Sequence, residues 1–172
     1  MWKRLDKIIF NILEKNIEKM PIRFQKIIAY YYTDARIRKI YWKKLGIEMG
    51  ENTYSNLGLV LIPNSNNPCV KIGKNVSIGP NLCLVCDSDA NNGIEIREIA
   101  KKKNFLKQGN IIIEDEVWIG ANVTILPGVK VGKNSIIGAG SLINKDVEPY
   151  SLYYGFPAKK IKSLLGEKNE NN

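Results

Sequence analysis

The chain has 172 residues, 44% of them hydrophobic, which is enough for one domain with modest additions and a sizeable core. No apolar stretch is long enough to span a membrane, and the N-terminus lacks a signal-peptide pattern, so we expect a cytoplasmic protein. Three cysteines, Cys69, Cys83 and Cys86, do not suggest a disulfide framework. Because the chain has no histidine, the Cys-x-x-Cys pair lacks further ligands, and we expect no metal site.

Positive charge is concentrated in the first quarter of the chain. The net charge is +9, but residues 1–46 hold twelve Lys or Arg against four Asp or Glu, while the other 126 residues hold 14 against 13. This asymmetry indicates an anionic surface as a partner of the N-terminal segment and not of the body.

The main pattern in the sequence is a six-residue period of aliphatic residues. It occurs in two runs separated by a break: Ile72, Ile78 and Leu84, then Ile113, Ile119, Ile125, Val131, Ile137 and Ile143. The units from residue 113 to 148 stay in phase, which chance does not explain. A period of six fits neither an amphipathic helix nor an alternating strand, but it fits a short strand followed by a tight turn.

Three such units predict a triangular coil, and stacked coils predict an all-β solenoid. We expect the aliphatic residue of each unit to point inward and to stack into one continuous core. Small and amide residues are expected to provide the backbone freedom that the corners need: Gly73, Asn75, Gly120, Asn122, Gly132 and Asn134.

The N-terminal segment is expected to form amphipathic helices, with Pro21 at the start of the second one. Two roles are considered for these helices. Their apolar face packs on the open end of the solenoid and caps it, which we favour, or they lie against the anionic inner face of a membrane. A nucleic-acid partner is disfavoured, because the charge lies on amphipathic helices.

The repeat loses its phase once, over residues 90–110, which predicts a loop pushed out of a coil and placed as a flap over a site. The predicted organisation is therefore amphipathic helices at 1–45, a β-helix with this loop insertion at 46–150, and a C-terminal extension at 151–172. Within the extension we expect a disordered tail at 166–172.

Four segments resemble a known family. Residues 117–129, 137–141 and 144–147 resemble the hallmark sequences of the hexapeptide-repeat acetyltransferases, and 155–161 resembles that family's Gly-x-Pro-Ala-Lys ending. The subgroup resembled is that of the galactoside, maltose and surface-polysaccharide O-acetyltransferases, over about residues 46–163. The resemblance implies a left-handed parallel β-helix. It also implies a homotrimer, with acetyl-CoA as acyl donor in the groove between neighbouring solenoids.

The resemblance also implies a set of contacts with acetyl-CoA. Two small residues would line the pantetheine arm, an amide and an ammonium group would flank the nucleotide, and two lysines would meet phosphates. The two small residues are Ala121 and Ala139. Asn144 and Lys145 would flank the nucleotide, and Lys159 and Lys162 would meet the phosphates.

The family's general base is a histidine, which takes the proton of the acceptor hydroxyl as the oxygen attacks the thioester. This chain has none. Counting from residues 78–81 places Asp89 at that position, whereas a second family pattern, Asp-Ser-Asp-x-His, places Asn91 there. An aspartate with its ordinary pKa of about 3.9 is a poor base, although burial or the neighbouring Asp87 would raise the pKa of Asp89. Asn91 could only hydrogen-bond.

Three alternatives stay open. The chain is a working enzyme with Asp87 or Asp89 as base, a variant whose histidine was replaced, or an enzyme whose amine acceptor is already partly deprotonated. The predicted reaction transfers the acetyl group of acetyl-CoA to a sugar hydroxyl, or an amine, of a small or lipid-linked surface-polysaccharide precursor. The alternative function is a non-catalytic CoA-binding or scaffold protein. A zinc carbonic anhydrase on this fold is excluded, because its ligands are histidines.

Overall fold

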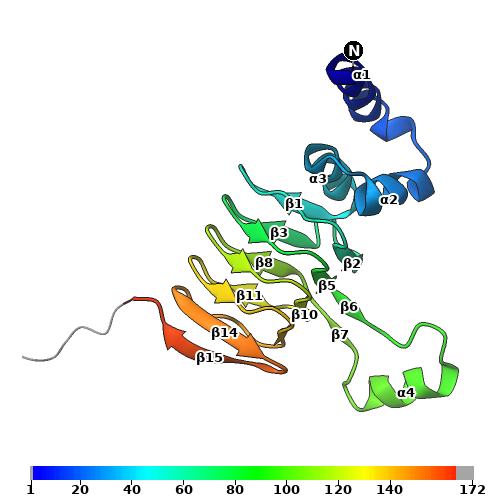
Figure 1. Ribbon diagram of the computed structural model, residues 1–172. Helices are drawn as coiled ribbons and strands as arrows, with labels where there is room; N and C mark the ends of the chain where they lie inside the picture. The colour runs from blue at the N-terminus through cyan, green and yellow to red at the C-terminus, as the bar shows by residue number, and fades with distance from the viewer. Residues whose placement is uncertain (1, 166–172) are drawn as a thin grey trace, which may run out of the picture.

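The structure, a computed structural model, describes residues 2–165. Its body is a stack of coils with short strands on three sides (Figure 1). The tail predicted at 166–172 lies outside the described residues.

Three sheets form the sides of the stack. The first contains, in order, β1 (Ile47–Met49), β3 (Val70–Ile72), β8 (Ile111–Ile113) and β11 (Lys130–Val131). The second contains β2 (Val60–Ile62), β5 (Cys83–Val85), β10 (Thr124–Ile125) and β13 (Leu142–Ile143). The third contains β4 (Ser77–Ile78), β9 (Trp118–Ile119), β12 (Ile136–Ile137), β14 (Ser151–Gly155) and β15 (Ala158–Ser163). Every pair in these sheets is parallel except β14–β15, so the predicted parallel sheets are confirmed.

The aliphatic residues of the hexapeptide units fill the interior of the stack. All nine are buried, with at most 8% of their surface exposed. Along β8 the exposure alternates, because Ile111 and Ile113 are buried while Ile112 is 43% exposed. The inward stacking of these residues is therefore confirmed.

Asparagines and glycines play different roles at the corners. Asn75, Asn122 and Asn134 have φ angles of +54°, +56° and +56°, a left-handed conformation that an amide side chain tolerates. The prediction that glycine provides backbone freedom at these corners is wrong for Gly120, because its φ angle is not positive. A Cβ atom on Gly120 would lie 2.6 Å from the backbone nitrogen of Ala139. Glycine is needed here for the close approach of two coils, not for backbone freedom.

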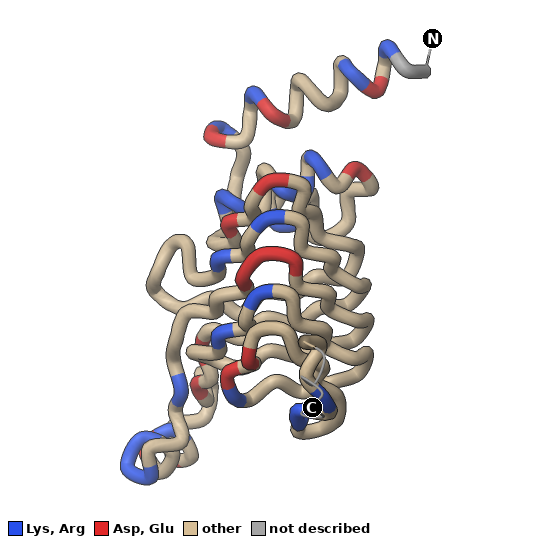
Figure 2. Tube along the Cα trace, turned by 90° about the vertical axis from the view of Figure 1, so that its left-hand side faces the viewer, with Lys and Arg blue, Asp and Glu red and all other residues tan. Residues whose placement is uncertain are grey.

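Charged residues alternate in sign from coil to coil along one side of the stack (Figure 2). Between neighbouring coils, Lys130 Nζ lies 2.7 Å from a carboxylate oxygen of Glu114. The hydrogen bond between them raises the pKa of Lys130 and lowers that of Glu114. An exposed pair of this kind contributes little stability, but the alternation avoids like charges on adjacent coils.

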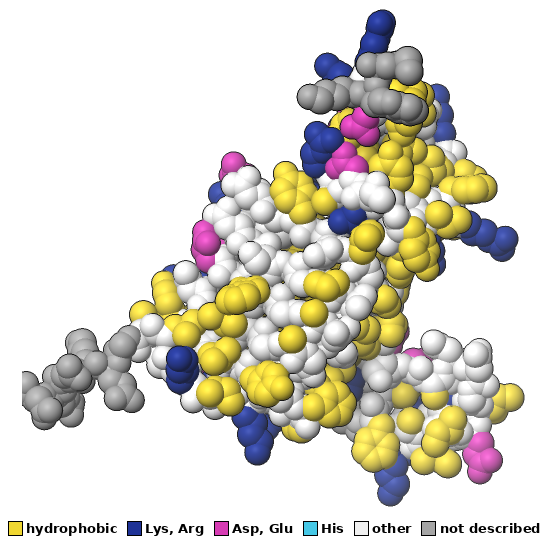
Figure 3. Space-filling view, viewed as in Figure 1, with side chains coloured by type: hydrophobic (Ala, Val, Ile, Leu, Met, Phe, Trp, Pro, Cys, Tyr) yellow, Lys and Arg dark blue, Asp and Glu magenta, His cyan; other side chains and the backbone are white. Residues whose placement is uncertain are grey.

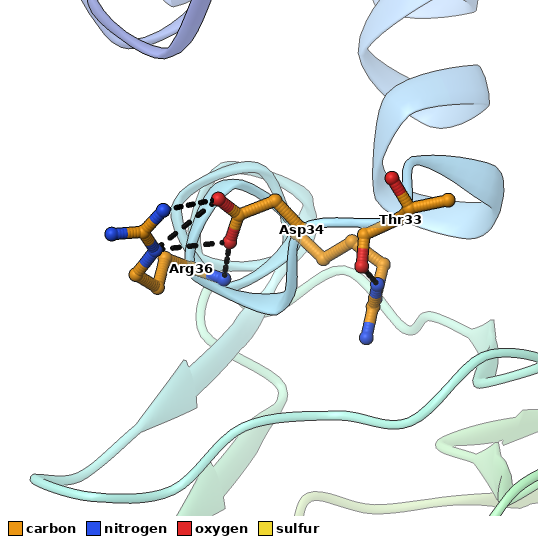
Figure 4. Close-up of polar contacts among 4 residues, drawn as sticks. Thr33, Asp34 and Arg36 are labelled. Carbon is orange, nitrogen blue, oxygen red and sulfur yellow. Dashed lines mark hydrogen bonds and ion pairs between the residues drawn. The ribbon is translucent and has the colours of Figure 1, made fainter. Parts of the chain in front are cut away.

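The N-terminal segment contains three α-helices, as its helical pattern predicts: α1 (Trp2–Lys15), α2 (Ile22–Tyr31) and α3 (Ala35–Leu45), with a 3-10 turn at Ile17–Lys19. Asp34 begins α3 by accepting a hydrogen bond from the backbone nitrogen of Arg36 at 2.8 Å (Figure 4). The guanidinium of Arg36 lies 2.6 Å from the same carboxylate and lowers its pKa. Gly46, at φ +109°, ends the helix.

The open end of the coil stack is covered mainly by α3. Its Ile37, Tyr41 and Trp42 are at most 1% exposed, and Ala29 of α2 is equally buried. Helix α1 lies farther from the coils, beyond α3 (Figure 1). Among residues 2–165, no helix is long and apolar enough to cross a membrane.

The insertion predicted as a loop at 90–110 contains a helix, α4 (Ile94–Lys102). It stands on an antiparallel stalk of β6 (Asp87–Ser88) and β7 (Lys107–Gln108), and the whole arm projects from the stack (Figure 1). Ile96 and Ile99 keep a helical i, i+3 spacing, but Ile94 lies off this stripe and all three are exposed. The helix was not predicted because the segment is mainly polar and basic. The division of the chain into domains stays a prediction, although β14 continues the third sheet beyond residue 150.

Candidate functional site

The candidate residues lie at the two edges of the second sheet. Because its strands are parallel, their carboxyl ends share one edge. Asp87 comes shortly after β5 and Asn144 directly after β13, so both lie at this edge. Ala121 and Ala139 lie in the corners before β10 and β13, at the opposite edge. Asp87 and Asn144 are two coils apart, about 10 Å along the stack at ordinary strand spacing.

Asp89 is held by an arginine that the sequence analysis did not single out. Arg97 of α4 donates from Nε and Nη2 to both carboxylate oxygens of Asp89, at distances of 3.0, 3.1 and 2.7 Å. These hydrogen bonds lower the pKa of Asp89 and raise that of Arg97. The shift is opposite to the one that a general base needs, and both oxygens are already engaged. Chemically, the pair suits anchoring of the arm better than proton transfer.

The other two catalytic candidates lie at the base of the same arm. An oxygen of Asp87 accepts a hydrogen bond from Gln108 Nε2 at 3.1 Å, across the β6–β7 stalk. The negative charge of Asp87 also contributes to the raised pKa of Arg97. Asn91 is exposed in the turn that leads into α4. The three candidates therefore share one short segment, and Arg97 connects two of them electrostatically.

A cavity of about 350 Å³ lies between the end of β13 and the β14–β15 hairpin. Three of the six predicted acetyl-CoA contacts line it together: Asn144, Lys145 and Lys159. Lys145 and Lys159 are exposed. A third lysine, Lys160, and one carboxylate, Asp146, line the cavity as well. The excess of ammonium groups over the carboxylate suits an anion such as a phosphate.

The remaining predicted contacts lie outside this cavity. Lys162 is on β15, opposite Leu152, and Lys160 takes part in the cavity lining instead. The ammonium group of Lys160 is 2.5 Å from a carboxylate oxygen of Glu148, which raises the pKa of this lysine. Sequence reasoning missed Lys160 because the register of the hairpin, with an irregularity between Leu152 and Tyr153, decides which lysines face the cavity.

The two alanines stack on neighbouring coils at the opposite edge. The backbone nitrogen of Gly140 donates to the carbonyl of Ala121 at 2.8 Å and so joins the two corners. Ala121 is half-buried and Ala139 is exposed. With only methyl side chains, these corners leave the backbone open to a ligand's approach.

The cysteines are structural in their surroundings. All three thiols are free; Cys69 and Cys86 are buried, and Cys83 is half-buried. Burial raises the pKa of Cys86 to about 12, which leaves it an unreactive thiol at neutral pH. Within the described part of the chain, no group of three metal-ligating side chains is found.

Comparison with known proteins agrees with this architecture. A family model described as bacterial transferase hexapeptide (six repeats) matches residues 110–145. The galactoside O-acetyltransferase of Escherichia coli strain K12 is 36% identical over 118 residues, which are 69% of this chain and 54% of that protein. The resemblance to the hexapeptide-repeat acetyltransferases is confirmed. The chain nevertheless spans only about half the length of the curated relatives it matches.

Solved structures of this family extend the match to almost the whole chain. A hexapeptide-repeat acetyltransferase of Vibrio cholerae, complexed with acetyl coenzyme A, superposes with a TM-score of 0.66 at 26% identity, over 91% of this chain and 89% of that one. A galactoside acetyltransferase in complex with coenzyme A gives 0.62 at 26% identity, over 91% and 80%. The chain therefore shares its overall fold with these hexapeptide-repeat acetyltransferases.

Proposed function

We propose that the chain is an acetyl-CoA-dependent acetyltransferase that acts on a sugar hydroxyl, or an amine, of a surface-polysaccharide precursor. The observation that carries this proposal is the cavity formed by Asn144, Lys145 and Lys159 at the sheet edge from which the arm leaves. The names of the relatives and the ligands of the matched structures support acetyl-CoA as donor. The cytoplasm, which holds an acetyl-CoA pool, is the proposed place of action.

The fold and assembly proposed with this function are a left-handed coil stack and a homotrimer. The matched structures support the handedness through their shared fold. The trimer is supported by large apolar side chains on the outer faces of the sheets, such as Trp118 at 60% and Ile112 at 43% exposure. Sedimentation at several protein concentrations tests it, and a species with the mass of a single chain throughout would refute it.

In this proposal the donor crosses the face of the second sheet. Lys145 and Lys159 bind phosphates in the cavity, with Asn144 beside the nucleotide and Lys162 at its outer side. Ala121 and Ala139 border the pantetheine arm at the other edge. Strands of two residues are about 7 Å long, so one extended donor reaches both edges.

The chemical step needs a proton acceptor at the thioester. Because the pantetheine arm ends at the sheet edge opposite Asp87 of the same chain, this proton acceptor is supplied in this proposal by the arm of a neighbouring chain of the homotrimer. The acceptor oxygen attacks the thioester carbonyl carbon, a carbon–oxygen bond forms, the carbon–sulfur bond breaks, and coenzyme A leaves as the thiolate. The hydroxyl proton passes to a base, for which Asp87 is favoured over Asp89, because Arg97 occupies both oxygens of Asp89. Asn91 would contribute a hydrogen bond only. An amine acceptor of low pKa would need less help from a base.

A second candidate function is that of a non-catalytic CoA-binding or scaffold protein. It is favoured by the complete lack of histidine and by the ion pair that engages Asp89. In this case the donor cavity would be kept without turnover. Loss of a general base typically costs about 10²- to 10⁴-fold in rate, so binding and turnover have to be measured separately.

Calorimetric titration with acetyl-CoA tests the donor site. We expect micromolar binding, weakened about tenfold by Lys145→Ala or Lys159→Ala, because each loses a charge-assisted contact with phosphate. Lys71→Ala, an exposed lysine of β3 in another sheet, is the matched control and should bind normally. If the unaltered protein does not bind acetyl-CoA, both candidate functions are refuted, because both need the donor site.

Turnover of variants with a histidine separates the two candidates. Asn91→His should raise thiol release from acetyl-CoA about 10²-fold in the presence of acceptor sugars. Asp89→His should raise it less, because this change also removes the partner of Arg97. Asp87→Asn should lower the activity of the unaltered chain. Tight binding of acetyl-CoA with no turnover in any of these proteins would favour the non-catalytic candidate.

A further inference from the structure

Helix α1 carries an apolar stripe that the protein itself leaves uncovered. Leu5, Ile8, Ile9 and Ile12 follow the i, i+3, i+4, i+7 spacing of one helix face, and they are 45%, 47%, 37% and 54% exposed. The side that α1 turns to the body is a different one, where Phe10 and Leu13 are partly buried. The amphipathic face predicted to cap the solenoid is therefore mostly in solvent.

Helix α2 adds a second uncovered stripe. Phe24, Ile27 and Tyr31, at i, i+3 and i+7, are 58%, 54% and 74% exposed, whereas Gln25 and Ala29 face the interior. Hydrophobic side chains gather over α1 and α2 on the face shown in Figure 3, with Lys and Arg side chains projecting around them. Because α3 already covers the coil end, these stripes are not needed as a cap.

The charge beside the stripes is cationic. Arg4 precedes Ile8 by four residues and Lys15 follows Ile12 by three, so both flank the stripe of α1. Arg23 and Lys26 of α2 are exposed as well. An apolar helix face bordered by lysine and arginine is the composition of a helix that lies in the surface of an anionic bilayer.

Two acidic groups of the same segment are turned toward the body. Asp6 contributes to the raised pKa of Arg36 in α3, and Glu18 lies 2.5 Å from Lys44 of the same helix. Pairing with α3 partly neutralises these two charges, while Glu14 of α1 is exposed. Between positions 4 and 31, six Lys or Arg residues outnumber three Asp or Glu residues, so the segment stays basic.

We propose that α1 and α2 together form a docking surface for an anionic lipid bilayer. The apolar stripes insert at the boundary between headgroups and acyl chains, and the flanking cations contact lipid phosphates. This inference goes beyond the proposed acetyltransferase function and does not depend on it, because vesicle binding requires neither acetyl-CoA nor turnover. It would hold the chain at a surface on which lipid-linked acceptors reside, with the α4 arm directed away from α1 (Figure 1).

Co-sedimentation of the full chain with vesicles tests the proposal. The protein is expected to bind vesicles of phosphatidylcholine mixed with phosphatidylglycerol and not vesicles of phosphatidylcholine alone, and added salt should weaken binding. The double substitution Ile8→Ser with Ile12→Ser should lower partitioning about tenfold, because less apolar surface is inserted. Arg4→Gln with Lys15→Gln should lower it by a similar factor.

Helix α4 provides matched controls, because it also exposes apolar and basic residues. Ile94→Ser with Ile96→Ser, and Lys101→Gln with Lys102→Gln, change equally exposed side chains and should leave vesicle binding unchanged. Equal binding to neutral vesicles, no binding to anionic ones, or an equal loss in the α4 controls would overturn the proposal. The proposal would also be overturned if the α1 variants partitioned normally but had a changed oligomeric mass in the absence of lipid. That result would assign the stripe of α1 to a contact with a second copy of the chain.

Discussion

At the scale of single residues, the ion pair of Asp89 and Arg97 joins the arm to the base from which it leaves the coils. The pair spans eight residues and connects α4 to the segment after β6. Because the hydrogen bonds of Arg97 depress the pKa of Asp89, the stabilisation is present above the ordinary pKa of an aspartate. It is lost as the pH falls through the lowered value in the folded protein.

Hydrogen exchange of the α4 amides measures this dependence. Protection should stay constant from neutral pH down to the ordinary pKa range of an aspartate and then fall progressively until the pH is below the lowered pKa of Asp89. Arg97→Gln should show weak protection at every pH and no acid step, while Glu98→Gln on the same helix serves as control. An acid step that persists in Arg97→Gln would show that another group anchors the arm.

At the scale of secondary-structure elements, the close contact of coils at their corners is the most demanding feature. A Cβ on Gly120 would meet the backbone of the next coil at 2.6 Å, whereas one on Gly140 would meet no atom within 4 Å although its φ is +72°. Gly120→Ala should therefore cost about 1–3 kcal/mol of unfolding free energy, as overpacking does. Gly140→Ala should cost about 1 kcal/mol, from backbone strain alone.

Urea denaturation of the two glycine variants decides between close approach and backbone freedom. Both glycines lie in corners between the third and the second sheet, Gly120 before β10 and Gly140 before β13. Both substitutions add one methyl group. A larger loss of unfolding free energy at Gly140 than at Gly120 would mean that backbone conformation, as the sequence pattern suggested, is the stricter requirement at these corners.

The elements also differ in how well the sequence predicts them. The coil strands were predictable because each hexapeptide encodes its own strand and turn, as the alternation along Ile111, Ile112 and Ile113 shows. Helix α4 was not predicted, because its apolar stripe is short, the surrounding segment is polar and basic, and the ion pair of Arg97 with Asp89 follows no local pattern. The cavity was predictable only in part, since the facing of Lys160 and Lys162 depends on a hairpin register that no local pattern specifies.

At the scale of the whole molecule, helices and coils are joined through one buried arginine. Arg38 of α3 is 4% exposed. Its Nη1 donates to the carbonyls of Tyr32 and Thr33 at 2.6 and 2.8 Å, and its Nη2 donates to the carbonyl of Ser55 in the first coil at 2.5 Å. The same side chain therefore fixes the α2–α3 connection and the start of the solenoid. Burial lowers the pKa of Arg38, but an arginine keeps its charge in the protein interior.

Removing this side chain should uncouple the helical cap from the coils. Arg38→Met keeps most of the apolar volume but leaves the carbonyls of Tyr32, Thr33 and Ser55 without this donor. Of these contacts the one with Ser55 is buried, so we expect a cost of about 1–3 kcal/mol. Arg36→Gln is the matched control two residues away. Arg36 is exposed, and its ion pair with Asp34 and its cation–π contact with the Phe10 ring, 5.0 Å away, both lie within the helical segment, so its effect should be much smaller. Unfolding followed by tryptophan fluorescence, which includes Trp42 of the cap, and by circular dichroism should coincide in the unaltered protein and separate in Arg38→Met. Coincident and unshifted transitions in Arg38→Met would mean that the packing of Ile37, Tyr41 and Trp42, with the hydrogen bond from Lys39 to the carbonyl of Gly50, holds the cap on the coils without Arg38.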